Sequence, residues 1–172
     1  PLSRITEAMS SVGEDLSYQK IEGLSGDMAV VGNTFNQMSE RLITRDSLLK
    51  ESEERLRAII DNTSAIIYLK DINGKYILIN RQYENLFNIS SKDIIGKTDK
   101  DIFPKDKADA LLKSDRKVFD TKSSITFEET MYHDGELNTY ISLKFPLLDM
   151  ENNAYGICGM STDISERKNM ED

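Results

Sequence analysis

Residues 65–80, AIIYLKDINGKYILIN, set the class of fold. Two runs rich in Ile, Leu and Tyr, 65–70 and 75–80, flank Asp-Ile-Asn-Gly at 71–74, which has the composition of a hairpin turn. Before Asn62 the apolar residues recur with a helical period instead. The sequence therefore predicts a β-hairpin that follows a helical region and opens a mixed domain.

The segments after the hairpin predict an α+β domain. Two short helices and a longer one are expected at 81–88, 91–95 and 104–119. Three more strands follow at 124–132, 137–147 and 154–162, with turns at 133–136 and 149–153. Runs of helices and strands in this order favour a five-stranded antiparallel sheet with helices on one face.

The first 45 residues carry two apolar seams with heptad spacing. They consist of Leu2, Ile5, Met9 and Val12, and of Met28, Val31, Phe35, Met38 and Leu42. A two-helix hairpin encloses such narrow seams poorly, so we expect a homodimer that forms a parallel four-helix bundle. The glycine-containing stretch 13–26 is long enough to return the chain along the bundle.

Residues 27–61 are expected to form one long helix. They contain no proline, and their only glycine is Gly32. At about 1.5 Å per residue the helix is about 50 Å long. The alternative is two helices with a hinge near 44–47.

Composition limits the partners and the compartment. The net charge is −8, with 7 basic and 11 acidic residues in 1–62 and 15 and 19 in the remainder. Neither part shows the basic footprint of nucleic-acid binding, so no nucleic-acid partner is expected. Cys158 is the only cysteine, which fits a reducing compartment, and no apolar run is long enough to span a bilayer.

Over 54–168 the chain resembles the PAS family of sensor domains. The resemblance rests on motifs in a characteristic order: Tyr68-Leu69-Lys70-Asp71 with Gly74, Ile79-Asn80, Gly96-Lys97-Thr98-Asp99, Asp101-Ile102-Phe103-Pro104, Gly156-Ile157, and Thr162-Asp163-Ile164-Ser165-Glu166-Arg167-Lys168. The last run is similar to the terminal Asp-Ile-Thr motif of the family, with Ser165 in the Thr place.

The N-terminal part resembles a HAMP module, a relay placed just inside the membrane in many receptors. Pro1-Leu2 matches the start of its first helix, Phe35-Asn36-Gln37-Met38 matches the Phe-Asn-x-Met motif of its second, and Asp27 takes the place of a glutamate where the second helix opens. The two resemblances imply a relay at 1–45, a connecting helix at 46–62, a PAS domain at 63–168 and an exit helix from 169. They further imply the cytoplasmic side of a membrane receptor, such as a sensor histidine kinase, whose transmembrane and output domains lie outside this chain.

No catalytic or metal-binding set stands out. His133 is the only histidine and falls at an expected turn, and Cys158 reads as a small packed strand residue. PAS domains that hold haem or reactive flavin carry a histidine or a cysteine on or near the long helix. The stretch 104–119 has neither, so no cofactor is expected.

Strand alternation gives the residues expected to face the helices and to line a ligand pocket. With the sheet oriented as the PAS resemblance implies, they are Tyr68, Lys70, Ile157, Gly159 and Ser161, joined by Arg116 of the long helix and by Tyr140 or Ser142. A buried Lys or Arg among apolar neighbours requires a partner. A small anionic ligand with a carboxylate would supply one, and the alternatives are an ion pair with Glu128 or Glu129 or extension of the side chain to water.

The end of the last predicted strand is where a signal is expected to leave the domain. Asp163 and Ser165 can cap the following helix, and an ion pair between Asp163 and Arg167 would couple the sheet to it. The alternative role of Asp163 is capping alone. We thus expect a non-catalytic signal-transducing segment, with a flavin- or haem-binding sensor or a pure dimerisation scaffold as alternatives.

Overall fold

The computed structural model describes residues 20–133 and 136–171. The chain divides into two compact units between Leu56 and Arg57. Helix α2 (Asp27–Asp61) is continuous over 35 residues, which confirms the predicted single long helix and excludes the hinge near 44–47. Within the described ranges, no helix combines the length and the apolar character needed to cross a bilayer.

In the first unit, the segment before α2 packs against the helix. Ile21 is buried and contacts Leu24, Met28 and Phe35. The side chain of Asn36 accepts a hydrogen bond from the Ile21 N–H at 3.0 Å and donates one to the Ile21 carbonyl at 2.9 Å. These bonds satisfy the backbone of the connecting segment against the helix.

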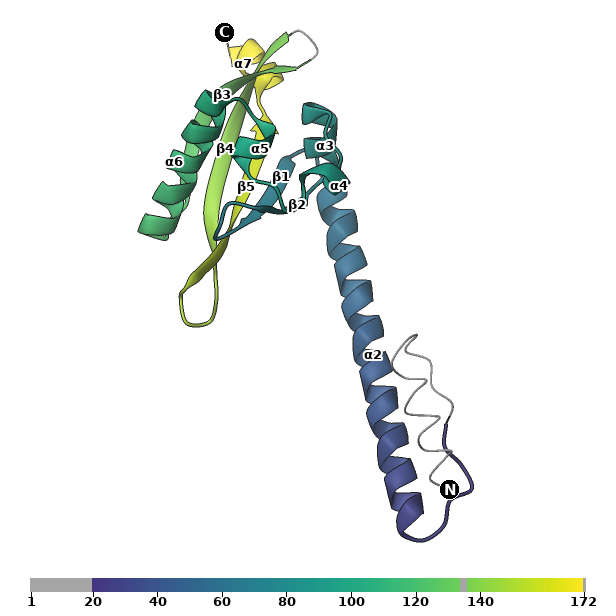
Figure 1. The fold of residues 1–172 in the computed structure, drawn as a ribbon. Coiled ribbons are helices and arrows are strands. Elements are labelled where there is room, and N and C mark those ends of the chain that lie inside the picture. Colours follow the sequence, from purple (N-terminus) through teal and green to yellow (C-terminus); the bar gives the residue numbers. More distant parts are fainter. Residues whose placement is uncertain (1–19, 134–135, 172) are drawn as a thin grey trace. The chain divides into compact units, whose positions relative to one another are not determined.

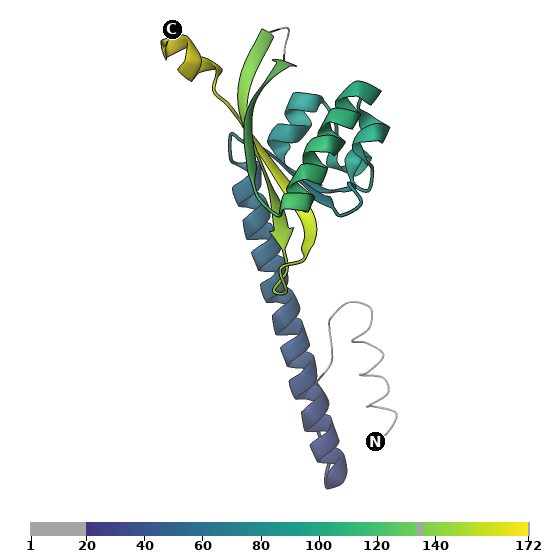
Figure 2. The same ribbon diagram turned by 90° about the vertical axis from the view of Figure 1, so that its left-hand side faces the viewer.

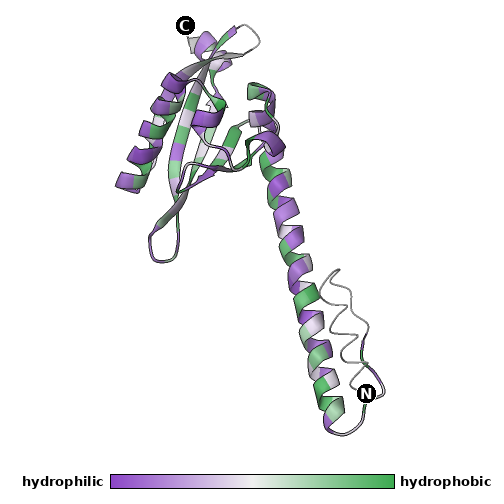
Figure 3. Cartoon of the chain, in the orientation of Figure 1, coloured by the Kyte–Doolittle hydropathy of each residue, from purple (hydrophilic) through white to green (hydrophobic). Residues whose placement is uncertain are grey.

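The residues of the second predicted seam differ in burial. Met28 and Phe35 pack against Ile21, whereas Val31, Met38 and Leu42 are at least half exposed. Figure 3 shows hydrophobic positions recurring along α2 between hydrophilic ones. The first seam, Leu2, Ile5, Met9 and Val12, lies outside the described residues, so the four-helix bundle stays a prediction.

The second unit contains one sheet of five antiparallel strands, as predicted (Figure 1). Its order is β2-β1-β5-β4-β3. The strands are β1 (Ile66–Asp71), β2 (Tyr76–Ile79), β3 (Ile125–His133), β4 (Glu136–Leu148) and β5 (Ala154–Asp163). The backbone of His133 ends β3 and pairs with Glu136, the first residue of β4, while residues 134–135 of the turn predicted at 133–136 lie outside the described residues.

Four helices cover one face of this sheet (Figure 2). They are α3 (Arg81–Phe87), α4 (Ser91–Ile94), α5 (Asp99–Ile102) and α6 (Lys105–Thr121). The sequence analysis did not identify α5, although Thr98 and Asp101 form a capping box at its start. Helix α7 (Ser165–Glu171) starts four residues before the exit helix predicted from 169.

Asn80 connects the start of the sheet to its neighbours. This fully buried side chain accepts hydrogen bonds from the N–H groups of Ile67 and Tyr83. Through the bond from Tyr83, Asn80 serves as the N-cap of α3. Its amide nitrogen donates to the carbonyls of Ile60 and Ala65. One side chain thus joins the end of α2, strand β1 and α3.

The core lies on both faces of the sheet. On the face toward α3–α6, Ile79 and Ile94 are fully buried together with a cluster of tyrosines. On the opposite face, Ala65, Ile67 and Cys158 are buried beside Ile60. Cys158 therefore packs as a small core residue.

Candidate ligand cavity

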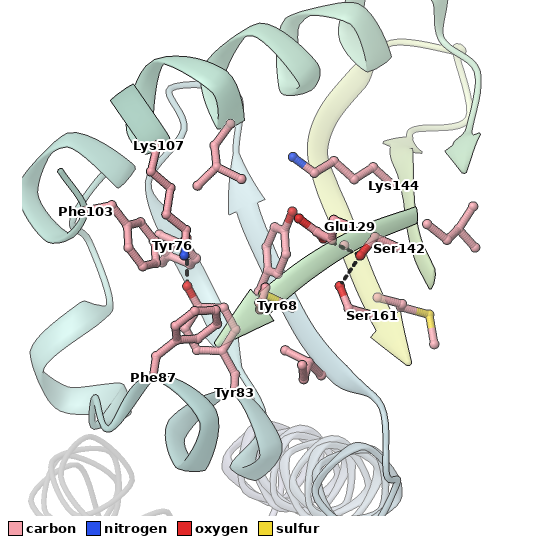
Figure 4. Close-up of a pocket in the computed structure, with 16 residues that line it drawn as sticks. Tyr68, Tyr76, Tyr83, Phe87, Phe103, Lys107, Glu129, Ser142, Lys144 and Ser161 are labelled. Carbon is pink, nitrogen blue, oxygen red and sulfur yellow. Dashed lines mark hydrogen bonds between the residues drawn. The ribbon is translucent and has the colours of Figure 1, made fainter. Parts of the chain in front are cut away.

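A cavity of about 50 Å³ lies between the sheet and the helices α3 and α6 (Figure 4). All five strands contribute one wall, and residues of α3, α6 and the segment between α5 and α6 contribute the other. Ligand sites for drug-sized molecules usually measure roughly 300–1,000 Å³. The side chains that fill the interior therefore determine what this cavity can hold.

Three tyrosines occupy much of the interior. The rings of Tyr68, Tyr76 and Tyr83 meet edge to face, with centroids 5.8–5.9 Å apart. The Tyr83 hydroxyl donates to the Tyr76 hydroxyl at 2.9 Å, and Tyr76 donates to Asp99 Oδ1 at 2.7 Å. Burial is the main cause that raises the pKa of both Tyr76 and Tyr83, so both phenols are neutral donors at physiological pH.

Beside the tyrosines lies a buried set of two lysines and two aspartates. Lys70 Nζ contacts Asp99 Oδ2 at 2.5 Å and Asp115 Oδ2 at 2.9 Å. Lys144 Nζ contacts Asp115 Oδ1 at 2.6 Å and the Ser114 hydroxyl at 2.6 Å. The four formal charges cancel, and each ion has hydrogen-bonded partners, as a buried charge requires.

This network identifies the partners of the buried lysine. The sequence left open an anionic ligand, Glu128, Glu129 or solvent for Lys70. The structure shows Asp99 from α5 and Asp115 from α6, and the Lys70 side chain is only 1% exposed. Lys70 thus ties β1 to two helices.

Besides Lys144 of this network, two other charged side chains line the cavity. Lys107 places its Nζ 4.9 Å and 4.5 Å from the ring centroids of Phe87 and Phe103. Burial of the ammonium lowers the pKa of Lys107, and Glu129 and Asp99 partly offset that effect. Across the Tyr68 ring in Figure 4, Glu129 accepts a short hydrogen bond from Ser142.

Ser142 and Ser161 complete this polar wall. They are paired across β4 and β5, and their hydroxyl oxygens lie 2.7 Å apart. The wall therefore consists of one carboxylate and two hydroxyls held in register by the sheet.

Tyr68 lies at the centre of the cavity wall. The residue is 8% exposed, and the described residues provide no hydrogen-bond partner for its hydroxyl. Its ring crosses β5 at Gly159, where an added Cβ would lie 2.2 Å from Tyr68 Cζ. Burial first, and then the Asp115 and Asp99 carboxylates, raise the pKa of Tyr68 well above its usual value.

The predicted pocket residues separate into two groups. Tyr68, Ser142, Gly159 and Ser161 line the cavity together. Lys70, Tyr140 and Ile157 are buried on the same face of the sheet but do not line the cavity.

Arg116 is exposed on α6 and lies away from the cavity, because the preceding Asp115 is the residue of this turn that faces the sheet. The proposed ligand role of all eight residues stays a prediction.

Sequence reasoning missed several residues of the site, among them Lys107, Tyr76, Tyr83, Asp99 and Asp115. A signal for Asp115 was present, because it occupies an apolar-face position of α6, four residues after Leu111 and three before Val118. No local signal distinguishes Lys107 from the other lysines of α6.

The exit end of the domain shows the predicted cap. The Asp163 carboxylate accepts hydrogen bonds from the Ser165 N–H at 2.8 Å and the Ser165 hydroxyl at 2.6 Å. Ser165 also accepts a bond from the Thr139 N–H at 2.9 Å, which joins α7 to β4.

A further ion pair ties this helix to β3. It joins Lys168 of α7 to Glu128, the neighbour of the cavity residue Glu129. The contacts of Asp163 described above do not include the predicted ion pair with Arg167. The role of Asp163 in signalling stays a prediction.

The described residues contain no group of three or more His, Cys, Asp or Glu side chains that could bind a metal ion. The sheet order, the helical cover and the small cavity between them define a single-sheet α+β domain. The PAS fold family matches residues 60–169, and the chain belongs to this family.

Relatives with known names are signalling proteins. The methanogenesis regulatory histidine kinase FilI of Methanothrix harundinacea is 26% identical over 98% of this chain and 19% of its own length. The aerobic respiration control sensor protein ArcB of Escherichia coli is 27% identical over 68% of this chain and 15% of its own length. A diguanylate cyclase of Vibrio cholerae is 29% identical over 63% of this chain and 35% of its own length. The chain thus spans a minor part of each of these relatives.

Solved structures share the fold. The PAS domain of Bordetella pertussis BvgS has a TM-score of 0.59 and 22% identity, covering 70% of this chain and 91% of that domain. A complex of Vibrio cholerae VqmA with ligand and DNA has a TM-score of 0.57 and 23% identity, covering 64% of this chain and 50% of that chain.

The VqmA complex corrects the expectation of no nucleic-acid partner. That expectation rested on net charge, yet a protein with the same fold forms a complex with DNA, and an RNA-binding light-oxygen-voltage receptor is also similar (TM-score 0.54, 14% identity, covering 69% of this chain and 35% of that chain). The charge of one segment does not describe a longer protein, so composition here does not exclude nucleic acid.

Proposed function

We propose that this chain is the sensing and relay segment of a signalling protein, in which the PAS domain responds to a small molecule and passes the response to an output domain. Helix α2 brings the chain into the domain and α7 leaves it. The relatives support this, because both regions align with a histidine kinase over 98% of the chain.

The observation that carries the proposal is the attachment of the exit helix beside the cavity. Glu129 faces the cavity and Glu128, the preceding residue of β3, holds Lys168 of α7. Because successive strand residues point to opposite faces, a shift of β3 at the cavity moves both side chains at once. A change in cavity contents can therefore alter how α7 is held.

The proposal extends to the helical region as a HAMP-like relay. Supporting it, Ile21 and Leu24 pack on α2, and Val31, Met38 and Leu42 form an exposed apolar stripe that Leu49 and Leu56 continue. A stripe of this spacing suits pairing with other helices in a dimeric bundle. Such a relay would lie on the cytoplasmic side of a membrane-anchored parent protein.

A chimera tests the relay. The chain replaces its aligned segment in the FilI histidine kinase, and autophosphorylation is measured for the parent chimera, Glu128→Gln, Lys168→Met and the exchanged pair Glu128→Lys with Lys168→Glu. We expect either single change to alter autophosphorylation at least about twofold, because an exposed ion pair contributes up to roughly 1 kcal/mol. We expect the exchanged pair to restore it.

Lys122→Met is the matched control, because this exposed lysine donates a hydrogen bond to the Asn152 carbonyl at 2.7 Å and is not part of the ion pair between α7 and β3. It should leave autophosphorylation unchanged. Equal activity in all variants would show that the contact of α7 with β3 plays no part in signalling.

A further inference from the structure

We propose that the cavity binds a small monocarboxylate anion, whose oxygens accept hydrogen bonds from the Tyr68 hydroxyl and the Lys107 ammonium. The inference rests on the proposed sensing function and names the class of ligand that is sensed. It differs from the sequence-based expectation, in which Lys70 or Arg116 would have bound the anion.

The Tyr68 hydroxyl supplies the first donor. More than nine-tenths of the residue is buried, its side chain lines the cavity, and the described residues leave its hydroxyl without an acceptor. The hydroxyl therefore has an unused donor on the cavity side. A ligand oxygen in the cavity would satisfy it.

The Lys107 ammonium supplies the second donor and the charge. In the described part of the chain, its Nζ has the Phe87 and Phe103 rings as neighbours and no carboxylate within 4.0 Å. Lys107 also lies in the first turn of α6, whose N-cap residue Pro104 makes no side-chain capping bond. The positive end of this helix adds to the attraction for an anion.

The other charged side chains in and beside the cavity limit the ligand to acids with a single carboxylate. Lys70 and Lys144 are already neutralised by Asp99 and Asp115, so neither offers a second cation. Glu129 lines the cavity with a carboxylate that would repel a second negative group on the ligand. It can accept a hydrogen bond from a ligand hydroxyl, which admits small hydroxy acids.

The volume sets the size. A cavity of about 50 Å³ compares with the roughly 10–15 Å³ of such space that one water needs, so it holds about three to five water-sized groups and suits an acid of about two or three carbons. A longer acid would have to displace the Tyr68 ring from Gly159, against which it packs.

Thermal unfolding of the full chain measures binding. Acetate, propionate and glycolate are titrated at constant ionic strength against acetamide and ethylammonium, which have a similar size but lack the negative charge. We expect a saturable rise in Tm with the carboxylates only, because a ligand that binds the folded state stabilises it by mass action.

Two variants remove one donor each and keep a side chain of similar size. Lys107→Met removes the ammonium and should weaken carboxylate binding about tenfold or more, and Tyr68→Phe retains the ring and should weaken it about threefold to tenfold. Lys113→Met and Tyr155→Phe, at exposed positions of α6 and β5, should bind as the parent does.

A rise in Tm with the amide or the amine but not the carboxylates would overturn this ligand class and leave the sensing function standing. Carboxylate binding that is unaffected by both variants would overturn the assigned site. If no compound raises Tm while the chimera responds to Glu128→Gln, the proposed ligand is rejected and the relay stands. If the chimera variants are all equal, the relay fails independently of binding.

Discussion

At the residue scale, the interior of the domain is governed by charge pairing. Lys70, at 1% exposure, has two carboxylate partners, and Asp115 bridges it to Lys144. Removing one member leaves a buried charge without compensation, which costs more than the pair contributes. The network therefore specifies how β1, α5, α6 and β4 are arranged.

Replacing Lys70 by Met tests this arrangement. We expect the free energy of unfolding in urea to fall by about 3–5 kcal/mol, because Asp99 loses its ammonium partner. Lys113→Met, an exposed change on α6, should stay within about 0.5 kcal/mol of the parent. A loss for Lys70→Met as small as that of the control would contradict a structural role for the network.

The Cys158 thiol gives a prediction about pH. Burial raises its pKa from 9.0 to about 11, so the folded thiol stays protonated where the unfolded thiol ionises. The unfolded state then binds fewer protons, and stability must fall as the pH rises from 9 toward 11.

Comparison of the parent with Cys158→Ala isolates this effect from the tyrosines and lysines that titrate in the same range. We expect the parent to lose more stability than the variant between pH 9 and pH 11, measured by urea unfolding. Identical losses would show that the thiol is not shielded from water.

At the element scale, Asn80 is the residue through which three elements meet. Its side-chain oxygen and nitrogen each make two hydrogen bonds to backbone groups of α2, β1 and α3 or the segments beside them. A fully buried amide with four partners is difficult to replace, because every alternative leaves some of those groups unpaired.

The variants Asn80→Ala and Asn80→Asp test the two halves of this side chain. Alanine removes all four bonds and should destabilise the domain by more than about 2 kcal/mol. Aspartate retains the acceptor oxygen but loses both donated bonds, so it should also destabilise. Asn73→Ala, in the exposed hairpin turn, is the control and should have a small effect in the same urea experiment. An Asn80→Ala variant as stable as this control would be inconsistent with a role of Asn80 in holding α2, β1 and α3 together.

At the scale of the whole molecule, the two units have separate cores. The cores on both faces of the sheet are formed within 57–172, whereas Ile21, Leu24, Met28 and Phe35 form a small cluster of their own. A cluster of that size buries little apolar surface. The PAS unit should therefore fold alone, and the helical unit should depend on further packing.

A fragment of residues 57–172 is expected to unfold cooperatively at nearly the urea midpoint of the full chain, followed by circular dichroism. A fragment that starts at residue 63 lacks the Ile60 carbonyl that Asn80 binds and should be less stable. Equal stability of the two fragments would show that the end of α2 is not part of the domain.

Much of the architecture was predictable because it depends on neighbours in the chain. The hairpin, the five strands, α6 and the length of α2 follow from alternation, helical period and turn residues. Helix α5 was missed because one turn of helix has too few residues to show a period. The start of α7 was placed late because its cap, Asp163, also ends a strand.

Local patterns in the amino-acid sequence were sufficient to predict the strands, the longer helices and their order, and ordered short motifs indicated the family, because each of those depends on residues close together in the chain. The tertiary structure alone decided which carboxylates hold Lys70, which cation reaches the cavity and how little space remains inside it. Lys70 and Asp115 are 45 residues apart, and no local pattern links them. They meet only when β1 and α6 pack across the same sheet.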